Sequence, residues 1–223
     1  MSLRRDLQLI AEWIRPGAHI LDLGCGSGAL LAHLQATRGV TGYGLEIDPD
    51  KITRCIARGV DVIQADLDQG MPDFDSDGFD YVIMTQSLQA LHYPDRVLDE
   101  MLRIGREGII SFPNMGHWKC RAQLALSGHM PKNRALPHDW YDTPNIHLCT
   151  VHDFERLCAG RGYRILERAA VDRHHRTTRG ARMLPNLLAE SALYRLQRQD
   201  AESSAPRAVP KKQTATPAER EAT

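Results

Sequence analysis

The sequence lacks the features that would assign it to several large classes of protein. It has 28 lysines and arginines against 28 aspartates and glutamates, so no net charge favours nucleic acid or an anionic membrane as a partner. Its five cysteines are an odd number without a C-x-x-C pair, a usage typical of reduced thiols. Residues 1–15 are interrupted by Arg4, Arg5, Asp6 and Glu12, so they predict neither a signal peptide nor a spanning helix. These absences together indicate a cytoplasmic protein whose partners are recognised locally.

Several catalytic and metal-binding motifs are also missing. Without a G-x-S-x-G nucleophile elbow, serine-based acyl transfer is excluded as the chemistry of this chain itself. There is no Asn-Pro-Pro-Tyr-like motif for N-methylation and no catalytic pair of cysteines. The tightest group of possible metal ligands is His147, Cys149 and His152, whose spacing does not match a zinc site. We therefore expect no metal.

What is present is an alternation of strand and helix patterns, within a length of 223 residues that suits one domain. Strands are predicted at 19–23, 41–46, 60–64, 79–84 and 108–112, and helices at 29–35, 49–57 and 94–103. This alternation predicts an α/β fold with a doubly wound parallel sheet. Such a sheet binds its ligands at the carboxyl ends of the strands.

The second half of the chain departs from this rhythm. Residues 114–145 are rich in aromatic side chains and prolines, which indicates an insertion or a lid. The pattern then resumes with a helix at 151–159, a strand at 163–167 and a final strand at 187–196 that could return antiparallel. From residue 200 the chain has almost no large apolar residue, so we expect one domain at 1–199 followed by a disordered polar tail at 200–223.

The most informative motif is the loop from residue 21 to residue 28, Leu-Asp-Leu-Gly-Cys-Gly-Ser-Gly. Gly24 and Gly26 allow a sharp bend and a close approach to a ligand, and Gly28 opens a helix whose amides face the site. The small size of Cys25 explains its place in the loop. The spacing suits a dinucleotide as well, but Asp22 would repel a pyrophosphate and attract the ammonium and sulfonium of S-adenosylmethionine. The loop therefore predicts the sulfonium cofactor.

Two further acidic residues follow neighbouring strands. Glu46 can accept hydrogen bonds from both hydroxyls of a ribose, and Asp66 can accept one from the exocyclic amine of an adenine while Leu67 packs on the ring. Each acid alone reads equally well as a cap or as a solvated turn residue. Three acids after three successive strands make an adenosyl site the better hypothesis.

With these motifs the sequence resembles the class I S-adenosylmethionine-dependent methyltransferases. The resemblance implies a Rossmann-like sheet of seven strands, the last antiparallel, and it places Gln86 and Ser87 beside the methyl group and its acceptor. The binding set it implies for S-adenosylmethionine or S-adenosylhomocysteine is Asp22, Gly24, Cys25, Gly26, Gly28, Glu46, Ile47, Asp66, Leu67 and Gln86.

Longer stretches resemble the MetW family of methionine biosynthesis, above all the irregular run from Leu136 to Thr150, which reads Leu-Pro-His-Asp-Trp-Tyr-Asp-Thr-Pro-Asn-Ile-His-Leu-Cys-Thr. Residues 20–27, 111–114 and 117–126 share the likeness. This resemblance implies a partner, a MetX-type homoserine O-acyltransferase that forms O-succinyl- or O-acetylhomoserine.

Two functions therefore remain open. One is an accessory protein that binds S-adenosylmethionine and supports the acyltransferase. The other is a methyltransferase acting on a small molecule, because methyl transfer depends on alignment and desolvation and does not require an acid or base motif. Trp118, Trp140 and Tyr141 in the insertion would form a partner interface in the first case and line a substrate pocket in the second.

Overall fold

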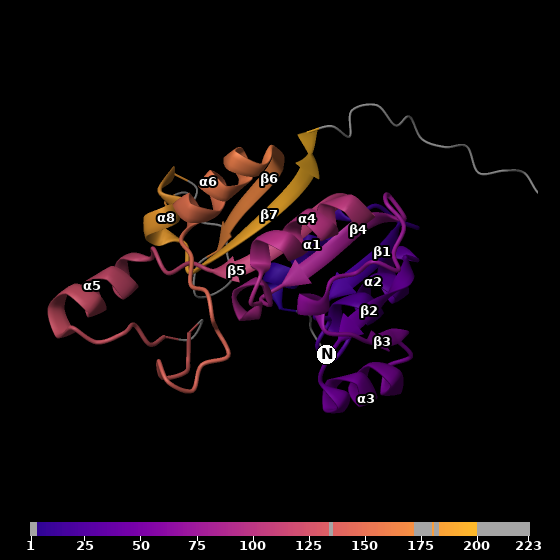
Figure 1. Ribbon diagram of the computed structural model, residues 1–223, viewed down its shortest axis with the longest axis horizontal. Coiled ribbons are helices and arrows are strands. Elements are labelled where there is room, and N and C mark those ends of the chain that lie inside the picture. The colour runs from indigo at the N-terminus through magenta and orange to yellow at the C-terminus, as the bar shows by residue number, and fades with distance from the viewer. Residues whose placement is uncertain (1–3, 134–135, 172–179, 181–182, 200–223) are drawn as a thin grey trace, which may run out of the picture.

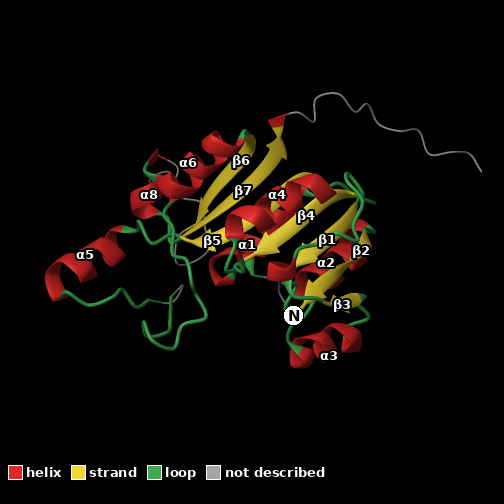
Figure 2. Ribbon diagram, in the orientation of Figure 1, coloured by secondary structure: helices red, strands yellow, loops and turns green. Residues whose placement is uncertain are grey.

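The structure, a computed structural model, describes residues 4–133, 136–171, 180 and 183–199, in which a twisted sheet lies between layers of helices (Figures 1 and 2). The strands are β1 (His19–Leu23), β2 (Thr41–Glu46), β3 (Val62–Gln64), β4 (Phe79–Thr85), β5 (Gly105–Pro113), β6 (Tyr163–Val171) and β7 (Ser191–Arg198). The helices are α1 (Arg5–Trp13), α2 (Ala29–Arg38), α3 (Pro49–Ala57), α4 (Pro94–Ile104), α5 (Trp118–Ser127), α6 (Val151–Arg161) and α8 (Pro185–Leu188), with 3-10 turns η1 (Leu67–Gln69) and η2 (Leu88–Ala90). The predicted tail at 200–223 lies outside the described residues.

The strand order in the sheet is β3-β2-β1-β4-β5-β7-β6. The first five strands are parallel, and β7 runs antiparallel to both β5 and β6. The predicted sheet of seven strands with an antiparallel last strand is thus confirmed. The order reverses between β1 and β4, and in doubly wound sheets a crevice for ligands opens outside the carboxyl ends at that point.

Alternation along the strands divides most of the core into two large clusters, one on each face of the sheet. In β4, Val82 and Met84 pack in the cluster that holds the apolar side of α4, whereas Tyr81 and Ile83 pack in the cluster that holds α1 and α2. Each of these four side chains is at most 2% exposed. A strand buried on both faces cannot slip by one residue without exchanging its two clusters, which fixes the register of the central strands.

Some predicted boundaries were wrong, and the reasons are local. The third strand begins at Val62 because Val60 still belongs to the turn that ends α3, where its amide donates to the Cys55 carbonyl at 3.0 Å. The last strand begins at Ser191, since Pro185 starts the helical turn α8 over residues that alternation had assigned to the strand.

The segment between β5 and α6 contains a helix that the sequence pattern did not predict. Helix α5 starts after His117, whose ring accepts a hydrogen bond from the Lys119 amide, and it ends at Gly128 in the left-handed conformation. In Figure 1 this helix projects from the end of the sheet where β5 finishes. We call the described part of residues 118–148 the arm.

Candidate cofactor site

A cavity of about 830 Å³ lies at the carboxyl ends of the parallel strands. The loops after β1, β2, β3 and β4 line it, and residues 144–145 of the arm close one side. The predicted residues in its wall are Gly24, Gly26, Glu46, Ile47, Asp66, Leu67 and Gln86. Asp22, Cys25 and Gly28 are not in the wall and lie within the strand and the loop behind it.

The glycine loop is bonded to the neighbouring strand. The amides of Gly24 and Cys25 both donate to the Leu45 carbonyl at the end of β2, at 2.9 and 3.0 Å. Gly26 has φ of +60°, and an added Cβ would find no atom within 4 Å, so open space surrounds this turn. At Gly28, with φ of +71°, a Cβ would meet the Cys55 sulfur at 3.0 Å. The positive φ favours glycine at both positions, and at Gly28 the close Cys55 sulfur also leaves little room for a Cβ.

Glu46 is 5% exposed, and its carboxylate is already committed to the backbone. Oε2 accepts from the Gly26 amide at 2.9 Å, and Oε1 accepts from the amides of Ile47 and Asp48 at 3.0 and 3.1 Å. A carboxylate offers about four acceptor positions, so about one position remains on Oε2. One acceptor position is therefore left for a ribose hydroxyl while Glu46 holds the glycine loop, and the contact with both hydroxyls stays a prediction.

Asp22 is 1% exposed at the end of β1, and its Oδ1 has no hydrogen-bond donor among the described residues. Burial, with a smaller contribution from the negative charge of Glu46, raises the pKa of Asp22 to about 7. A buried acceptor without a donor, close to a second carboxylate, suits a cationic neighbour. Because Asp22 is buried and does not line the cavity, its charge would act on a ligand in the cavity through space.

The adenine side of the predicted site follows β3. Asp66 caps the turn η1 by accepting from the Asp68 amide at 3.0 Å, so its interpretation as a cap is correct, and it also lines the cavity beside the buried Leu67. Asp68 accepts from the His92 ring nitrogen at 2.9 Å. Burial alone would raise the pKa of Asp68, but the bonds from His92 and from the Tyr93 amide lower it.

Gln86 marks the end of β4 with an unusual backbone conformation, φ of +58° in a residue other than glycine. Its amide donates to the Ser111 carbonyl at 2.9 Å, and the next residue, Ser87, donates from its hydroxyl to the Leu23 carbonyl at 3.2 Å. Holding such a residue in the left-handed region costs about 1 kcal/mol or more, and strain of this kind gathers at functional sites. Gln86 and Ser87 both line the cavity.

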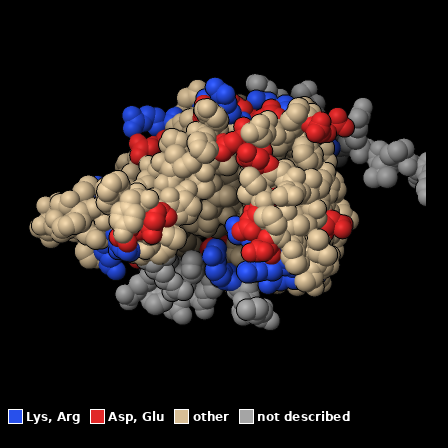
Figure 3. All heavy atoms as spheres, turned by 60° about the horizontal axis from the view of Figure 1, so that its bottom comes forward, with Lys and Arg blue, Asp and Glu red and all other residues tan. Residues whose placement is uncertain are grey.

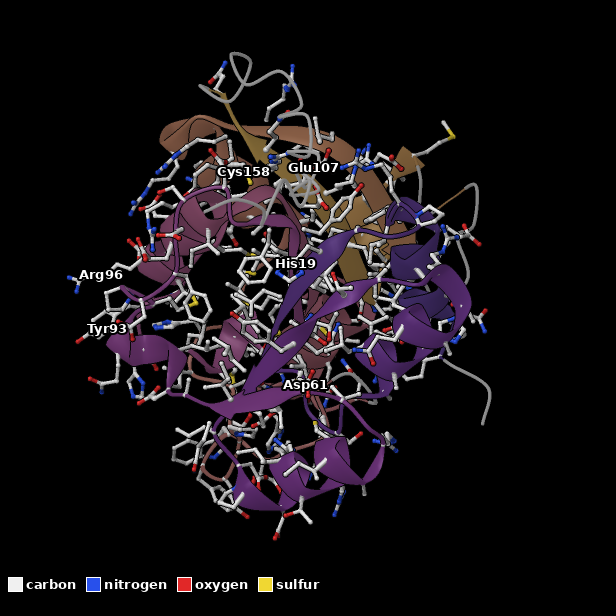
Figure 4. All side chains as sticks on the ribbon, turned by 90° about the vertical axis from the view of Figure 1, so that its right-hand side faces the viewer. His19, Asp61, Tyr93, Arg96, Glu107 and Cys158 are labelled. Atoms are coloured by element: carbon white, nitrogen blue, oxygen red, sulfur yellow. The ribbon has the colours of Figure 1, made fainter. Side chains whose placement is uncertain are left out.

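Sequence reasoning missed several residues in the cavity wall. Lys51, on the first turns of α3, lies 3.7 Å from the Glu46 carboxylate. Tyr93 also lines the cavity, with the Arg96 guanidinium 4.6 Å above its ring, and Figure 4 shows the two residues together at the edge of the molecule. Pro144 and Asn145 come from the arm, far away in the sequence. For Pro144 and Asn145, the one available signal in the sequence was their place in the irregular run 136–150.

The three aromatic residues of the insertion lie away from this cavity. Trp118, Trp140 and Tyr141 are 48%, 74% and 72% exposed, and none of them lines the wall. Trp140 instead lines a second cavity of about 350 Å³ within the arm, together with residues such as Met130, Leu136 and Leu148. The cofactor cavity and the aromatic surface are therefore separate.

The remaining predictions about chemistry concern thiols, metals and charge. Burial raises the pKa of the Cys25 thiol, which leaves little of the nucleophilic thiolate at neutral pH. Within the described residues, no three His, Cys, Asp or Glu side chains are grouped so as to hold a metal ion. No described helix combines the length and the apolar character needed to cross a bilayer. On the face seen in Figure 3, acidic and basic side chains are interspersed.

The sheet and its cavity define a class I methyltransferase fold. A methyltransferase structure from Mesorhizobium loti, described as dependent on S-adenosylmethionine, superposes with a TM-score of 0.63 at 20% identity, over 86% of this chain and 96% of that one. The family model for the methionine biosynthesis protein MetW matches residues 4–196. The chain therefore belongs to the MetW family.

Two curated relatives extend the comparison. The bifunctional methionine biosynthesis protein MetXA/MetW of Rhodopirellula baltica is 38% identical over 70% of this chain and 27% of its own length. The nocamycin O-methyltransferase of Saccharothrix syringae is 32% identical over 52% of this chain and 45% of its own length. The chain thus spans less than half the length of these two proteins.

Proposed function

We propose that the chain binds S-adenosylmethionine or S-adenosylhomocysteine in the cavity at the strand ends and serves as the partner of a MetX-type homoserine O-acyltransferase. Bound there, the cofactor would bring a sulfonium-linked methyl group or its demethylated counterpart. Gly24 and Gly26 would contact the cofactor through their backbone. Glu46 would bind its ribose, and Asp66 and Leu67 would contact its adenine. The buried charge of Asp22 would favour its cationic end.

The observation that carries the partner half of the proposal is the relative from Rhodopirellula baltica, whose name joins MetXA and MetW in one protein. Fusion makes an association intramolecular, which raises the effective concentration of the two parts. Two modules that work together gain from such a link. We extend this association to separate chains, with the present chain as the MetW part.

The arm is the contact surface that we propose. Of the large apolar side chains exposed on the described residues, about half belong to the arm: Trp118, Leu124, Leu126, Met130, Trp140, Tyr141, Ile146 and Leu148. Exposed apolar surface of this density is typical of interaction sites. Trp140 and Tyr141 pack edge to face with ring centroids 5.7 Å apart, which suits them to act as anchors.

The test is to co-express the tagged chain with its cognate acyltransferase and to measure complex recovery and acyl transfer from a coenzyme A thioester to homoserine. Trp140→Ala should weaken the complex by about 2 kcal/mol, which is about 30-fold in Kd. Ile56→Ala is the matched control, because Ile56 is an exposed apolar residue on α3, outside the arm. Full acyltransferase activity without this chain, together with no complex at micromolar concentrations, would refute the proposal.

The similarity to an O-methyltransferase over 52% of this chain favours a second candidate, methyl transfer to a small hydroxylated acceptor. The cavity extends past Ser87 to Tyr93 and Asn145, which leaves room for an acceptor beside the cofactor. Incorporation of a labelled methyl group into a defined small molecule by the purified chain would establish this activity in place of the accessory role.

A further inference from the structure

A short stretch of the arm forms a wall shared by the two cavities. Pro144 lines the cofactor cavity, Thr143 and Ile146 line the cavity within the arm, and Asn145 lines both. A displacement of this wall therefore changes both cavities at once. No other described residue is common to the two linings.

Hydrogen bonds fix the wall to the cofactor side of the protein. The amides of Ile146 and His147 both donate to the carbonyl of Gln89, at 2.7 and 3.0 Å. The side chain of Gln89 is 8% exposed, and its Nε2 donates to the Gln86 carbonyl at 2.7 Å. Gln86 lines the cofactor cavity in its strained conformation. The chain of contacts thus runs from Gln86 through Gln89 to the wall.

A second connection runs parallel to the first. Asp68, in the cofactor cavity, holds the ring of His92 at 2.9 Å, and the His92 carbonyl lies 3.2 Å from the ring nitrogen Nε2 of His147. The wall is therefore attached to the segments that follow both β3 and β4. These are the segments that a ligand in the cofactor cavity would contact.

We infer that this wall couples the two cavities, so that a ligand in the cofactor cavity raises the affinity of the arm for the acyltransferase. The inference rests on the proposed function, from which the partner is taken. A ligand that packs against Pro144 and Asn145 restricts the wall, and a restricted wall presents the arm cavity in one arrangement. By reciprocity, the acyltransferase raises the affinity for the cofactor by the same factor.

The arm cavity fits an apolar anchor from the acyltransferase. Leu136 and Trp140 give it apolar surface, and Lys132 and Asp139 at its edge neutralise each other in an ion pair of 2.7 Å. A pocket of this kind takes a large apolar side chain, the usual centre of a protein interface. The proposed function, supported by the fused relative, takes the acyltransferase as the partner that would supply that side chain.

The test uses S-adenosylhomocysteine as the probe and has two readouts. Hydrogen exchange of the wild-type chain should slow across 140–148 when the probe is added, with Ile146 and His147 as reporters, because their amides are bonded to Gln89. The Kd for the acyltransferase should fall at least about five-fold at saturating probe, a coupling of the usual size. Gln89→Met removes the bond to Gln86 and should reduce the factor below two, whereas Gln35→Met on α2 should retain it.

The outcomes separate the two ideas. A complex whose Kd is the same with and without the probe, with unchanged exchange at 140–148, overturns the coupling and leaves the proposed function intact. Absence of any complex, together with full acyltransferase activity without this chain, overturns the proposed partnership and the docking of the partner. In that case the exchange measurement decides whether the wall responds to the cofactor cavity. If Gln89→Met does not fold, the two wild-type measurements give the same decision.

Discussion

Replacing Asp22 by asparagine should make the protein more stable above pH 7. The substitution should also abolish the release of a proton that we expect on cofactor binding. The raised pKa means that the folded state binds the Asp22 proton more tightly than the unfolded state does. Between about pH 4 and pH 7 the folded chain therefore holds more protons, and this carboxyl makes stability fall as the pH rises. The loss is complete above the folded pKa.

The size of the effect follows from the shift. Moving the pKa from 3.8 to about 7 is a difference of about three units, equivalent to roughly 4 kcal/mol at most. The side chain of asparagine cannot ionise, so the Asp22→Asn variant should show none of this decline. Denaturant unfolding of both proteins at pH 5 and pH 8 measures the difference, and equal pH dependence in the two proteins would show that Asp22 is not buried as described.

Cofactor binding gives an independent measurement of the same group. With its pKa raised to about 7, Asp22 still binds a proton in part of the molecules near neutral pH, and a cationic ligand nearby favours the charged form. Binding of S-adenosylmethionine should release a fraction of a proton near pH 7 and almost none at pH 9. Calorimetry in two buffers of different ionisation enthalpy detects this release. Clear binding without buffer dependence at pH 7, or the same dependence in Asp22→Asn, would refute the electrostatic role.

Three further predictions concern other parts of the molecule. Glu46→Ala removes the carboxylate that holds the Gly26 amide. The loss of charge-assisted bonds worth roughly 1.5–3 kcal/mol should weaken cofactor binding about ten- to hundredfold. Calorimetry measures this affinity, and an unchanged value would contradict the prediction. Asn114→Ala should lower the free energy of unfolding by about 2 kcal/mol or more in a denaturant titration, because its buried side chain donates to Ala189 and accepts from Gly116 and Val151. Removing 200–223 should leave Tm nearly unchanged, since this segment has almost no large apolar residue, and a fall of several degrees would contradict our domain boundary.

Strands and helices whose burial follows a simple period could be predicted from the sequence. The strands at His19–Leu23 and Thr41–Glu46 and the helix at Pro49–Ala57 match their predicted bounds, because each combines a strong pattern with a clear stop. Helix α5 was not predicted, since its large apolar residues are mostly exposed and do not mark one buried face. Alternation also extended the last strand too early, over residues that Pro185 directs into a helical turn.

The cofactor site shows a similar division. Spacing was enough to predict which glycines and acids gather at the strand ends, because parallel strands bring their carboxyl ends together. Spacing could not show that Glu46 already accepts three backbone bonds or that Asp22 lies behind the cavity wall. Spacing also could not predict that Pro144 and Asn145 line the cavity, since that contact depends on the path of the arm.

The path of the arm also bears on the choice between the two functions. A substrate lid would be expected to place aromatic side chains over the reacting atoms, where they exclude water. Here the arm gives the cavity Pro144 and Asn145, while Trp140 and Tyr141 lie outside it and are largely exposed. Exposing two large aromatic side chains forgoes the free energy of burying them, unless another surface covers them. The geometry of the arm therefore favours a partner interface over a lid.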